Sequence, residues 1–262
     1  MEQRLKTEID DQGCATLCLN NPEQHNAFDD RLIAELTAAL LNLRNDSRVR
    51  IVLLTASGKS FSAGADLNWM RRVADYSLEE NVQDALGLAE LMQTLNELPK
   101  PTIALVQGAT FGGGVGLVAA CDIAIASERA SFCLSEVKLG LIPAVISPYV
   151  LAAIGPRQAR RYFLTAERFS AADALRIGLV HQVVPAEELQ STADQLCGEL
   201  LRNGPHALAA AKNLIQDVAG RPISKQLIEL TAERIAAIRA TEEGREGLDA
   251  FLNKRQPGWN KE

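Results

Sequence analysis

Two short loops of small residues could present backbone N–H groups to a negatively charged oxygen atom. The first is Ser62 to Leu67 (SAGADL), which follows an apolar run by a few residues. If Asp66 begins a helix, the amide groups around Ala65 point at an incoming anion. The second is Gly112-Gly113-Gly114, and glycines between two apolar segments can expose successive amides. One N–H group from each loop would make a two-donor oxyanion hole.

Each loop also has a purely structural interpretation. Residues 62–67 could form a tight turn between a strand and a capped helix, and the three glycines could mark a close contact between a helix and a strand. The two loops together favour the oxyanion hole. Uncharged residues around them would lower the local dielectric constant and so strengthen the donors.

Glu136 is the candidate for moving protons. It follows an expected strand at 131–133 and precedes the apolar segment 139–142. A carboxyl group that loses water in such a place has a raised pKa, which suits acid–base catalysis. The alternative is a surface glutamate paired with Lys138 or Arg129.

Other kinds of active site find little support in the sequence. The three histidines are scattered, and the chain has neither the G-x-S-x-G turn of a serine hydrolase nor a G-x-x-x-x-G-K-[ST] phosphate loop. No group of His, Cys, Asp or Glu has metal-site spacing, so we expect no metal site. We expect Cys14 and Cys18 to be packing residues.

The composition is that of an ordinary globular protein. The chain has 262 residues, of which 47% are hydrophobic and 23% charged, enough to bury a large core. The net charge of −6 argues against nucleic-acid binding. Residues 1–11 are rich in charge and lack the apolar core of a secretory signal, and five cysteines fit a reducing compartment. We therefore expect a cytoplasmic protein.

Residues 101–121 carry no charge, yet we do not expect them to cross a membrane. They include five glycines, a proline, a glutamine and two threonines. Such a composition predicts buried backbone beside a site rather than a helix that faces lipid.

Strands and helices alternate along the first 190 residues, which predicts an α/β fold with buried parallel strands. The expected strands are 5–9, 15–19, 50–55, 102–106, 123–126, 131–133 and 179–184, and the clearest helices are 29–43 and 78–98. From residue 186 onward the apolar pattern is helical. We therefore divide the chain into an α/β core at 1–190 and a helical assembly region at 191–262.

Several segments, in this order, resemble the enoyl-CoA hydratase/isomerase (crotonase) family. They are NPEQHNA at 21–27, FSAGADL at 61–67, QGATFGGG at 107–114, CDI at 121–123, EVKLGLIP at 136–143, RFSAADALRIGLV at 168–180 and FLNKRQPGW at 251–259. The resemblance covers nearly the whole chain. It implies a crotonase-like superhelix of β-β-α units, with a helical C-terminal region that makes trimers or dimers of trimers.

The resemblance also implies roles for particular residues. The two oxyanion-hole amides fall on Ala65 and Gly113, and Glu136 is the catalytic carboxylate. Residues expected to contact the acyl-CoA substrate are Ala65, Asp66, Leu67, Asn68 and Gly113, with His25, Asn26 and Ala27 near its nucleotide end. Because coenzyme A is part of the substrate, no separate cofactor is implied.

Gly116 departs from the usual hydratase pattern. Hydratases of this family commonly have a glutamate two positions after the third glycine of the loop, where this chain has Gly116. The chain therefore resembles a family member with one carboxylate, Glu136, a pattern also found in double-bond isomerases. We expect the space beside Gly116 to admit a branched substrate or an extra water molecule.

The leading functional prediction is reversible hydration of a 2-enoyl-CoA. The segments Glu136 to Val150 and Phe61 to Met70 look most like bacterial methylglutaconyl-CoA hydratases or isohexenylglutaconyl-CoA hydratases. One alternative is Δ3-Δ2 enoyl-CoA isomerisation, for which a single carboxylate suffices. Another is a noncatalytic relative that binds acyl-CoA or RNA, although the acidic charge balance disfavours RNA.

Overall fold

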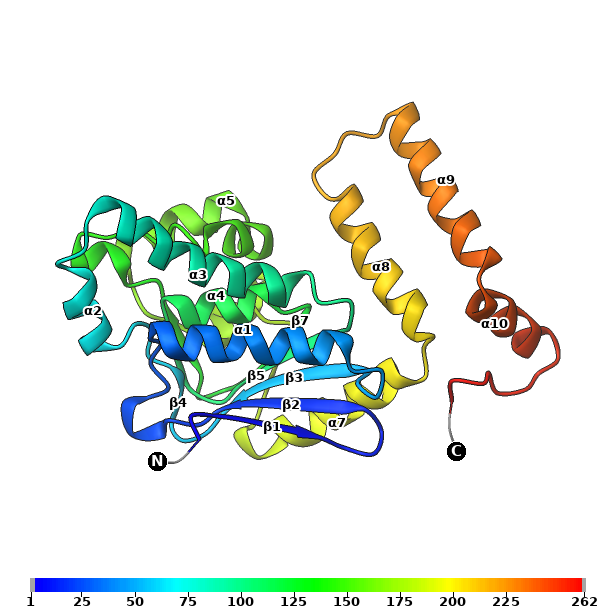
Figure 1. Cartoon of the computed structure of the whole chain (residues 1–262), viewed down its shortest axis with the longest axis horizontal. Coiled ribbons are helices and arrows are strands. Elements are labelled where there is room, and N and C mark those ends of the chain that lie inside the picture. Colours follow the sequence, from blue (N-terminus) through cyan, green and yellow to red (C-terminus); the bar gives the residue numbers. More distant parts are fainter. Residues whose placement is uncertain (1–2, 261–262) are drawn as a thin grey trace.

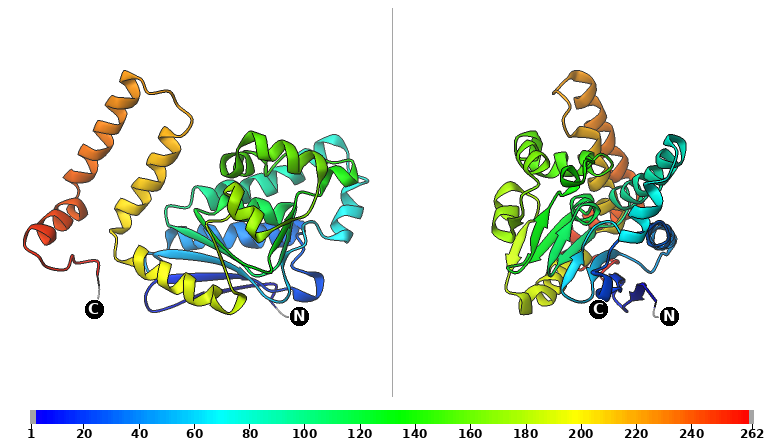
Figure 2. Two further views of the ribbon diagram at one scale, coloured as in Figure 1. Left: turned by 180° about the vertical axis from the view of Figure 1, so that it is seen from behind. Right: turned by 90° about the vertical axis from the view of Figure 1, so that its left-hand side faces the viewer.

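The computed structural model describes residues 3–260, which form an α/β body and a helical extension at the C-terminal end (Figure 1). Two sheets and the helices that pack on them make up the body, and the extension projects away from it (Figure 2). The mixed α/β architecture is the fold class that the sequence predicts.

The main sheet has six strands. In sheet order they are β1 (Leu5–Ile9), β2 (Cys14–Leu19), β3 (Ile51–Ala56), β5 (Thr102–Val106), β7 (Ile123–Ser127) and β10 (Gln182–Val184). β1 and β2 form an antiparallel hairpin, and the later neighbours pair in parallel. β3, β5 and β7 are buried along most of their length, as expected for strands covered on both faces.

Three strands of the main sheet lead directly into a second, smaller sheet. Its strands, in order, are β4 (Ser60–Ser62), β6 (Ala109–Phe111), β8 (Ser131–Cys133) and β9 (Phe169–Ser170). β4 follows β3, β6 follows β5 and β8 follows β7, and a helix comes after each short strand. These are the β-β-α units that the resemblance implies, and they set β4, β6 and β8 side by side.

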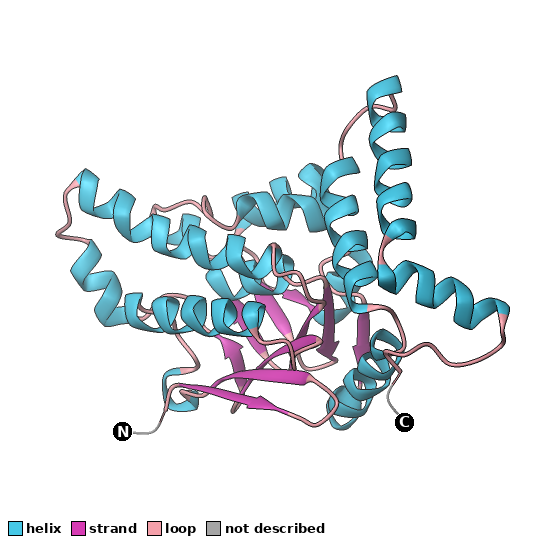
Figure 3. Ribbon diagram, turned by 45° about the vertical axis from the view of Figure 1, so that its right-hand side comes forward, coloured by secondary structure: helices cyan, strands magenta, loops and turns pink. Residues whose placement is uncertain are grey.

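Helices cover both faces of the main sheet (Figure 3). α1 (Asp30–Asn45), α3 (Leu78–Asn96), α4 (Gly113–Ala120) and α5 (Ser147–Thr165) lie on one face, and α7 (Leu189–Leu201) lies on the other. The remaining helices of the body are α2 (Leu67–Val73), α6 (Ala171–Ile177) and three 3-10 helices at Pro22–Gln24, Glu136–Leu139 and Ala186–Glu188.

Side chains of β3 alternate between two apolar clusters, because successive residues of a strand point to opposite faces. Val52 and Leu54 belong to the larger cluster, which includes residues of α1, α3 and α4. Ile51 and Leu53 belong to a smaller cluster that α7 completes.

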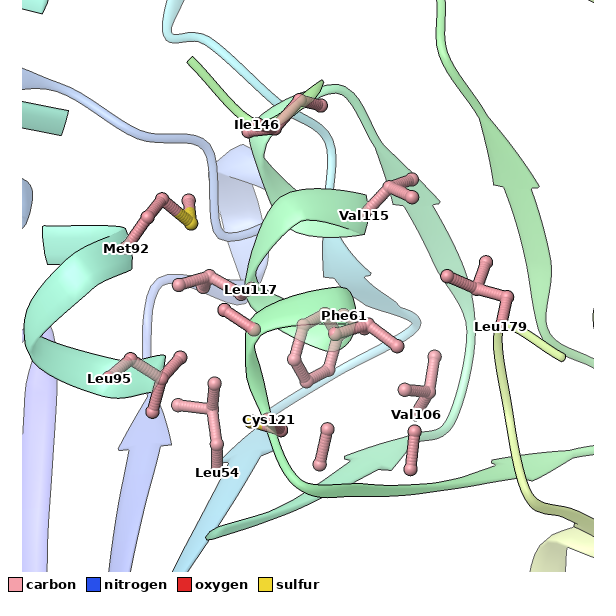
Figure 4. Packing of buried hydrophobic residues seen from close by; sticks show 14 of the residues in the cluster. Leu54, Phe61, Met92, Leu95, Val106, Val115, Leu117, Cys121, Ile146 and Leu179 are labelled. Atoms are coloured by element: carbon pink, nitrogen blue, oxygen red, sulfur yellow. The ribbon is translucent and has the colours of Figure 1, made fainter. Parts of the chain in front are cut away.

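α4 lies inside the larger cluster and carries no charged residue (Figure 4). Most of its residues are buried, and Leu54, Met92 and Ile146 from other parts of the chain lie around it. Dense packing of this kind holds the N-terminus of α4, at Gly113, in a fixed place.

The extension consists of α8 (Pro205–Val218), α9 (Lys225–Ala240) and α10 (Glu242–Leu252). The side-chain nitrogen of Lys212 on α8 lies 2.8 Å from Oδ2 of Asp122 in the body. That oxygen also accepts hydrogen bonds from the backbone N–H and the hydroxyl group of Thr102. The extension exposes large apolar side chains, namely Ile215, Ile223, Ile228, Ile235, Leu248, Phe251 and Leu252.

The largest differences from the predicted strands concern β10 and the second sheet. β10 begins at Gln182 rather than at Leu179, because Gly178 ends α6 in the left-handed conformation and Leu179 and Val180 are buried in the connecting loop. The short strands β4 and β6 were not predicted. The uncharged residues 101–121 form β5, β6 and α4, and no helix within residues 3–260 is long and apolar enough to cross a bilayer.

Candidate functional site

The loop after β4 holds Ala65 against a second segment of the chain. Ala65 forms a parallel bridge with Phe28. The N–H group of Phe28 donates to the Gly64 carbonyl at 2.7 Å, and the N–H group of Asp66 donates to the Phe28 carbonyl at 2.6 Å. The N–H group of Ala65 itself donates to no acceptor within residues 3–260, so it is free for a ligand.

Asp66 caps α2, as its residue type predicts. Its carboxylate accepts hydrogen bonds from the backbone N–H groups of Asn68 at 2.8 Å and Trp69 at 3.0 Å. Leu67 begins α2 and is largely exposed, whereas the Asn68 side chain accepts a hydrogen bond from Arg71. The cap fixes the direction in which the chain leaves Ala65.

Gly112 turns the chain into α4. Its φ of +50° lies in the region that favours glycine, and its N–H group donates to the Cys133 carbonyl at 3.0 Å. Gly113 is the first residue of α4, so its N–H group has no acceptor inside the helix. None of the described residues accepts a hydrogen bond from it either.

The two loops are in contact with one another. A Cβ atom built on Gly64 would lie 3.2 Å from the carbonyl oxygen of Phe111, and one built on Gly114 would lie 2.9 Å from Cβ of Ser62. Phe28, which bridges to Ala65, also reaches the second loop, because a Cβ atom on Gly113 would lie 3.2 Å from its ring. The structure thus brings the Ala65 and Gly113 loops together.

Glu136 lies where these loops meet. A Cβ atom built on Gly112 would lie 3.2 Å from Oε1 of Glu136 and 4.0 Å from Cα of Gly64. Burial raises the pKa of this carboxyl group, against a smaller lowering by its own backbone N–H group. Oε2 is buried without a hydrogen-bond partner among the described residues.

Glu136 is therefore not the ion-paired surface residue that the sequence left open. None of the ion pairs within residues 3–260 joins it to Lys138 or Arg129. A buried carboxyl group with an unused oxygen beside two free amide groups can hold and move a proton next to an oxyanion.

His25, Asn26 and Ala27 lie against the segment that connects β3 to β4. Asn26 is fully buried, and its side-chain amide donates to the carbonyl groups of Ser57 and Ser60 at 2.9 and 2.8 Å. His25 Nδ1 lies 3.0 Å from the Ser60 hydroxyl group, and Ala27 is buried next to them. These hydrogen bonds give Asn26 a structural role, which the sequence did not predict.

The expectation of free space beside Gly116 is wrong. A Cβ atom on Gly116 would overlap Cγ2 of Ile146, and it would lie 2.8 Å from Cβ of Ile146 and 3.2 Å from Cε of Met92. Ile146 is 2% exposed and comes from the segment after Pro143 (Figure 4). Its side chain occupies the volume that a larger residue at position 116 would need.

Two side chains of α2 hold it against its neighbours. The indole N–H group of Trp69 donates to Oδ1 of Asp84 on α3 at 2.9 Å, and Arg72 pairs with Asp30 on α1. α2 starts two residues after Ala65, so these contacts also position the Ala65 loop.

We expect Trp69→Phe to lower turnover severalfold and to cost about 1–2 kcal/mol of unfolding free energy, because the ring stays while the N–H group is lost. Asp84→Asn is the matched control, because it keeps an acceptor oxygen for the indole. Steady-state kinetics and urea unfolding of both variants measure the effect. Unchanged turnover in a destabilised Trp69→Phe would rule out a link between α2 and the Ala65 loop.

Comparisons with known proteins agree on one family. The model of the family described as enoyl-CoA hydratase/isomerase matches residues 10–262. The chain is similar to the crystal structure of an enoyl-CoA hydratase from Shewanella pealeana, with 50% identity, a TM-score of 0.95 and coverage of 98% of this chain and 96% of that one. It is also similar to an enoyl-CoA hydratase/isomerase from Marinobacter aquaeolei, with 33% identity, a TM-score of 0.92 and coverage of 98% and 99%. Enoyl-CoA hydratase domain-containing protein 3, mitochondrial, of Xenopus laevis is 32% identical over 252 residues, which are 95% of this chain and 84% of that protein.

Proposed function

The chain belongs to the enoyl-CoA hydratase/isomerase family, and from this premise we propose that it adds water reversibly to a 2-enoyl-CoA thioester. The observation that carries the proposal is the half-buried Glu136 carboxyl group, with Oε2 enclosed, at the junction of two loops whose Ala65 and Gly113 N–H groups have no acceptor among the described residues. The substrate brings its own coenzyme A, so the proposal includes no cofactor and no metal ion.

The Ala65 and Gly113 amide groups hold the thioester oxygen in this proposal. When water adds at Cβ, negative charge moves onto that oxygen as the enolate forms. Two fixed donors stabilise this charge, and losing one such donor typically costs about 2.7–4 kcal/mol. The position of Gly113 at the start of an uncharged, buried helix adds the positive end of the helix dipole.

Glu136 carries both proton transfers in this mechanism. Its carboxylate takes a proton from the attacking water as the oxygen bonds to Cβ, and it then gives a proton to Cα of the enolate. No second carboxylate is available at position 116, because that residue is a glycine backed by Ile146. One group can serve twice, because water addition leaves Glu136 protonated and Cα protonation restores the carboxylate.

The acyl group is proposed to be branched, as in methylglutaconyl-CoA or an isohexenylglutaconyl-CoA. Support comes from the segments Glu136 to Val150 and Phe61 to Met70, which look like those hydratases. The exposed side chains of Leu139, Leu141 and Ile142, just after Glu136, offer apolar surface for such a chain.

Isotope labelling tests hydration against its main alternative. Hydration in heavy-oxygen water places the label in the product, whereas isomerisation of a 3-enoyl-CoA gives an unlabelled product with a shifted double bond. The single carboxylate is the observation that favours the isomerase alternative. Tight CoA-ester binding without turnover of methylglutaconyl-CoA, crotonyl-CoA or 3-enoyl-CoA esters would instead support a noncatalytic relative.

The pH dependence of kcat/KM follows from the raised pKa of Glu136. The carboxylate must be ionised to accept a proton from water, so the rate falls as the pH drops through its pKa. Because burial raises this pKa, the acid limb is expected above the usual range for a glutamate. Initial rates across a pH series measure it, and a limb at the ordinary value would contradict a desolvated base.

We also propose that residues 191–262 drive assembly into trimers or dimers of trimers, in the cytoplasm. The exposed apolar side chains of the extension support this, since monomeric proteins in water rarely expose large apolar patches. We expect light scattering to give a mass that is a multiple of three chains, and Phe251→Asp to lower it. Glu233→Gln, an exposed polar change on α9, should leave the mass unchanged. A parent protein that stays monomeric at every concentration would refute the assembly.

A further inference from the structure

Two cysteines far apart in the sequence share one place in the fold. Cys14 begins β2, and Cys197 lies on α7. Both are buried, at 7% and 5% exposure, and both belong to the smaller apolar cluster between the main sheet and α7. Both thiols are free.

The two thiol groups are near neighbours, since both side chains belong to one small cluster and line one hollow. The Cys197 thiol, together with burial, raises the pKa of Cys14, whereas the Cys14 thiol lowers the pKa of Cys197, so Cys197 is the one that ionises more readily. The other three cysteines differ. Cys121 belongs to the larger cluster, Cys133 donates to the Ala166 carbonyl, and Cys18 donates to the carbonyl of Leu19.

A hollow of about 590 Å³ gives small molecules access to this pair. Cys14 and Cys197 line it together with four acidic residues, namely Glu8, Asp10, Asp11 and Asp194, among others. These four carboxylates make the entrance acidic. An acidic entrance disfavours anionic oxidants, such as oxidised glutathione, relative to small neutral ones.

The pair lies away from the proposed catalytic site. Cys14 is opposite Ile51, the first residue of β3, whereas the Ala65 loop follows the far end of that strand. Next to the pair, the Arg50 side chain donates to the carbonyl groups of Leu201 and Asn203 at the end of α7. A covalent link here would therefore act on α7 rather than on the oxyanion loops.

We infer that Cys14 and Cys197 form a dithiol that a small neutral hydroperoxide oxidises to a disulfide, which locks α7 onto the β1–β2 hairpin. The Cys197 thiolate attacks a peroxide oxygen, the O–O bond breaks, and a sulfenic acid forms as the other oxygen leaves and takes up a proton. The Cys14 sulfur then attacks the Cys197 sulfur, the S–O bond breaks, and water leaves with the Cys14 proton. The two thiols lose two electrons and the peroxide gains them.

Peptide mapping of the full-length protein tests this inference. The reduced protein is treated with hydrogen peroxide or with oxidised glutathione, free thiols are alkylated, and peptides are identified without reduction. We expect one cross-linked peptide that joins Cys14 to Cys197, formed faster with peroxide and lost on adding a dithiol reductant. We also expect a melting temperature several degrees higher, because the link closes a loop of about 180 residues in the unfolded chain. Turnover of an enoyl-CoA ester should change less than twofold.

Cysteine variants distinguish a specific link between Cys14 and Cys197 from general oxidation of thiols. Cys14→Ser and Cys197→Ala should each abolish the cross-link, whereas Cys18→Ser, four residues along β2, should leave it intact. Absence of the cross-linked peptide from folded protein, or links that join Cys14 or Cys197 equally often to Cys18, Cys121 or Cys133, would overturn the inference. So would a link that forms only after turnover has been lost, since it would then report unfolding.

Discussion

Glu136→Gln is expected to lower the turnover of an enoyl-CoA ester by about a hundred- to ten-thousand-fold, the range by which a positioned acid or base accelerates proton transfer. The amide cannot accept the proton of water or return one to Cα. The affinity for the CoA ester should stay within a few-fold, because the Ala65 and Gly113 amide groups remain. Steady-state kinetics and calorimetric binding of a nonreactive CoA ester measure the two effects separately.

The same variant should be more stable than the parent at neutral pH. Burial raises the pKa of Glu136, so the folded protein binds the proton more tightly than the unfolded chain does. Stability from this group is full below the pKa of the unfolded carboxyl group and is lost as the pH rises through the folded value. Urea unfolding should give Glu136→Gln a larger unfolding free energy than the parent at neutral pH, and this difference should disappear in acid. Equal stability at neutral pH, or turnover kept by the variant, would contradict a buried catalytic carboxylate.

Gly116→Ala is expected to destabilise the protein by about 1–3 kcal/mol, although alanine is the better helix former. The added methyl group would overlap Ile146 and crowd Met92. Gly87→Ala is the matched control, since Gly87 also lies in a helix and a Cβ atom there meets nothing within 4 Å. That change should stabilise by up to about 1 kcal/mol. Urea unfolding of the two variants gives the comparison.

A double-mutant cycle with Ile146→Ala identifies the cause. Ile146→Ala alone should cost about 2–5 kcal/mol because it leaves a cavity. In the double variant the alanine at 116 fills part of that cavity. The double variant should therefore be destabilised by less than the sum of the two single variants. Additive costs would mean that Ile146 is not what excludes a side chain at 116. Gly116→Glu should fail to fold well unless Ile146 is also shortened.

Local signals in the sequence predicted the parts of the site that depend on neighbouring residues. β5 was predicted with its correct ends, because Pro101 and Gln107 bound a short apolar run. Asp66 was expected to cap a helix because an aspartate before an apolar segment commonly does so, and it does. The three glycines were expected at a strand-to-helix junction, and α4 begins there.

The errors concern contacts between residues distant in the sequence. Ile146 fills the space beside Gly116 from thirty positions away, and no periodicity connects the two. β4 and β6 have three residues each, too few to show alternation, and they exist because β8 and the main sheet place partners beside them. Phe28 contacts both loops of the site, and the sequence did not predict these contacts because they too depend on tertiary packing.

The second sheet sets the distances among the residues of the candidate site. Ala65, Gly113 and Glu136 each come two or three residues after β4, β6 and β8, which are adjacent strands. Neighbouring strands lie about 4.8 Å apart, so backbone pairing fixes the spacing of the three groups. A one-residue slip of β6 would carry Gly113 about 3.3 Å along the strand, farther than a hydrogen bond can stretch. The side chains proposed to contact the acyl group can therefore change one by one, so that substrate preference changes while the distances among Ala65, Gly113 and Glu136 stay constant.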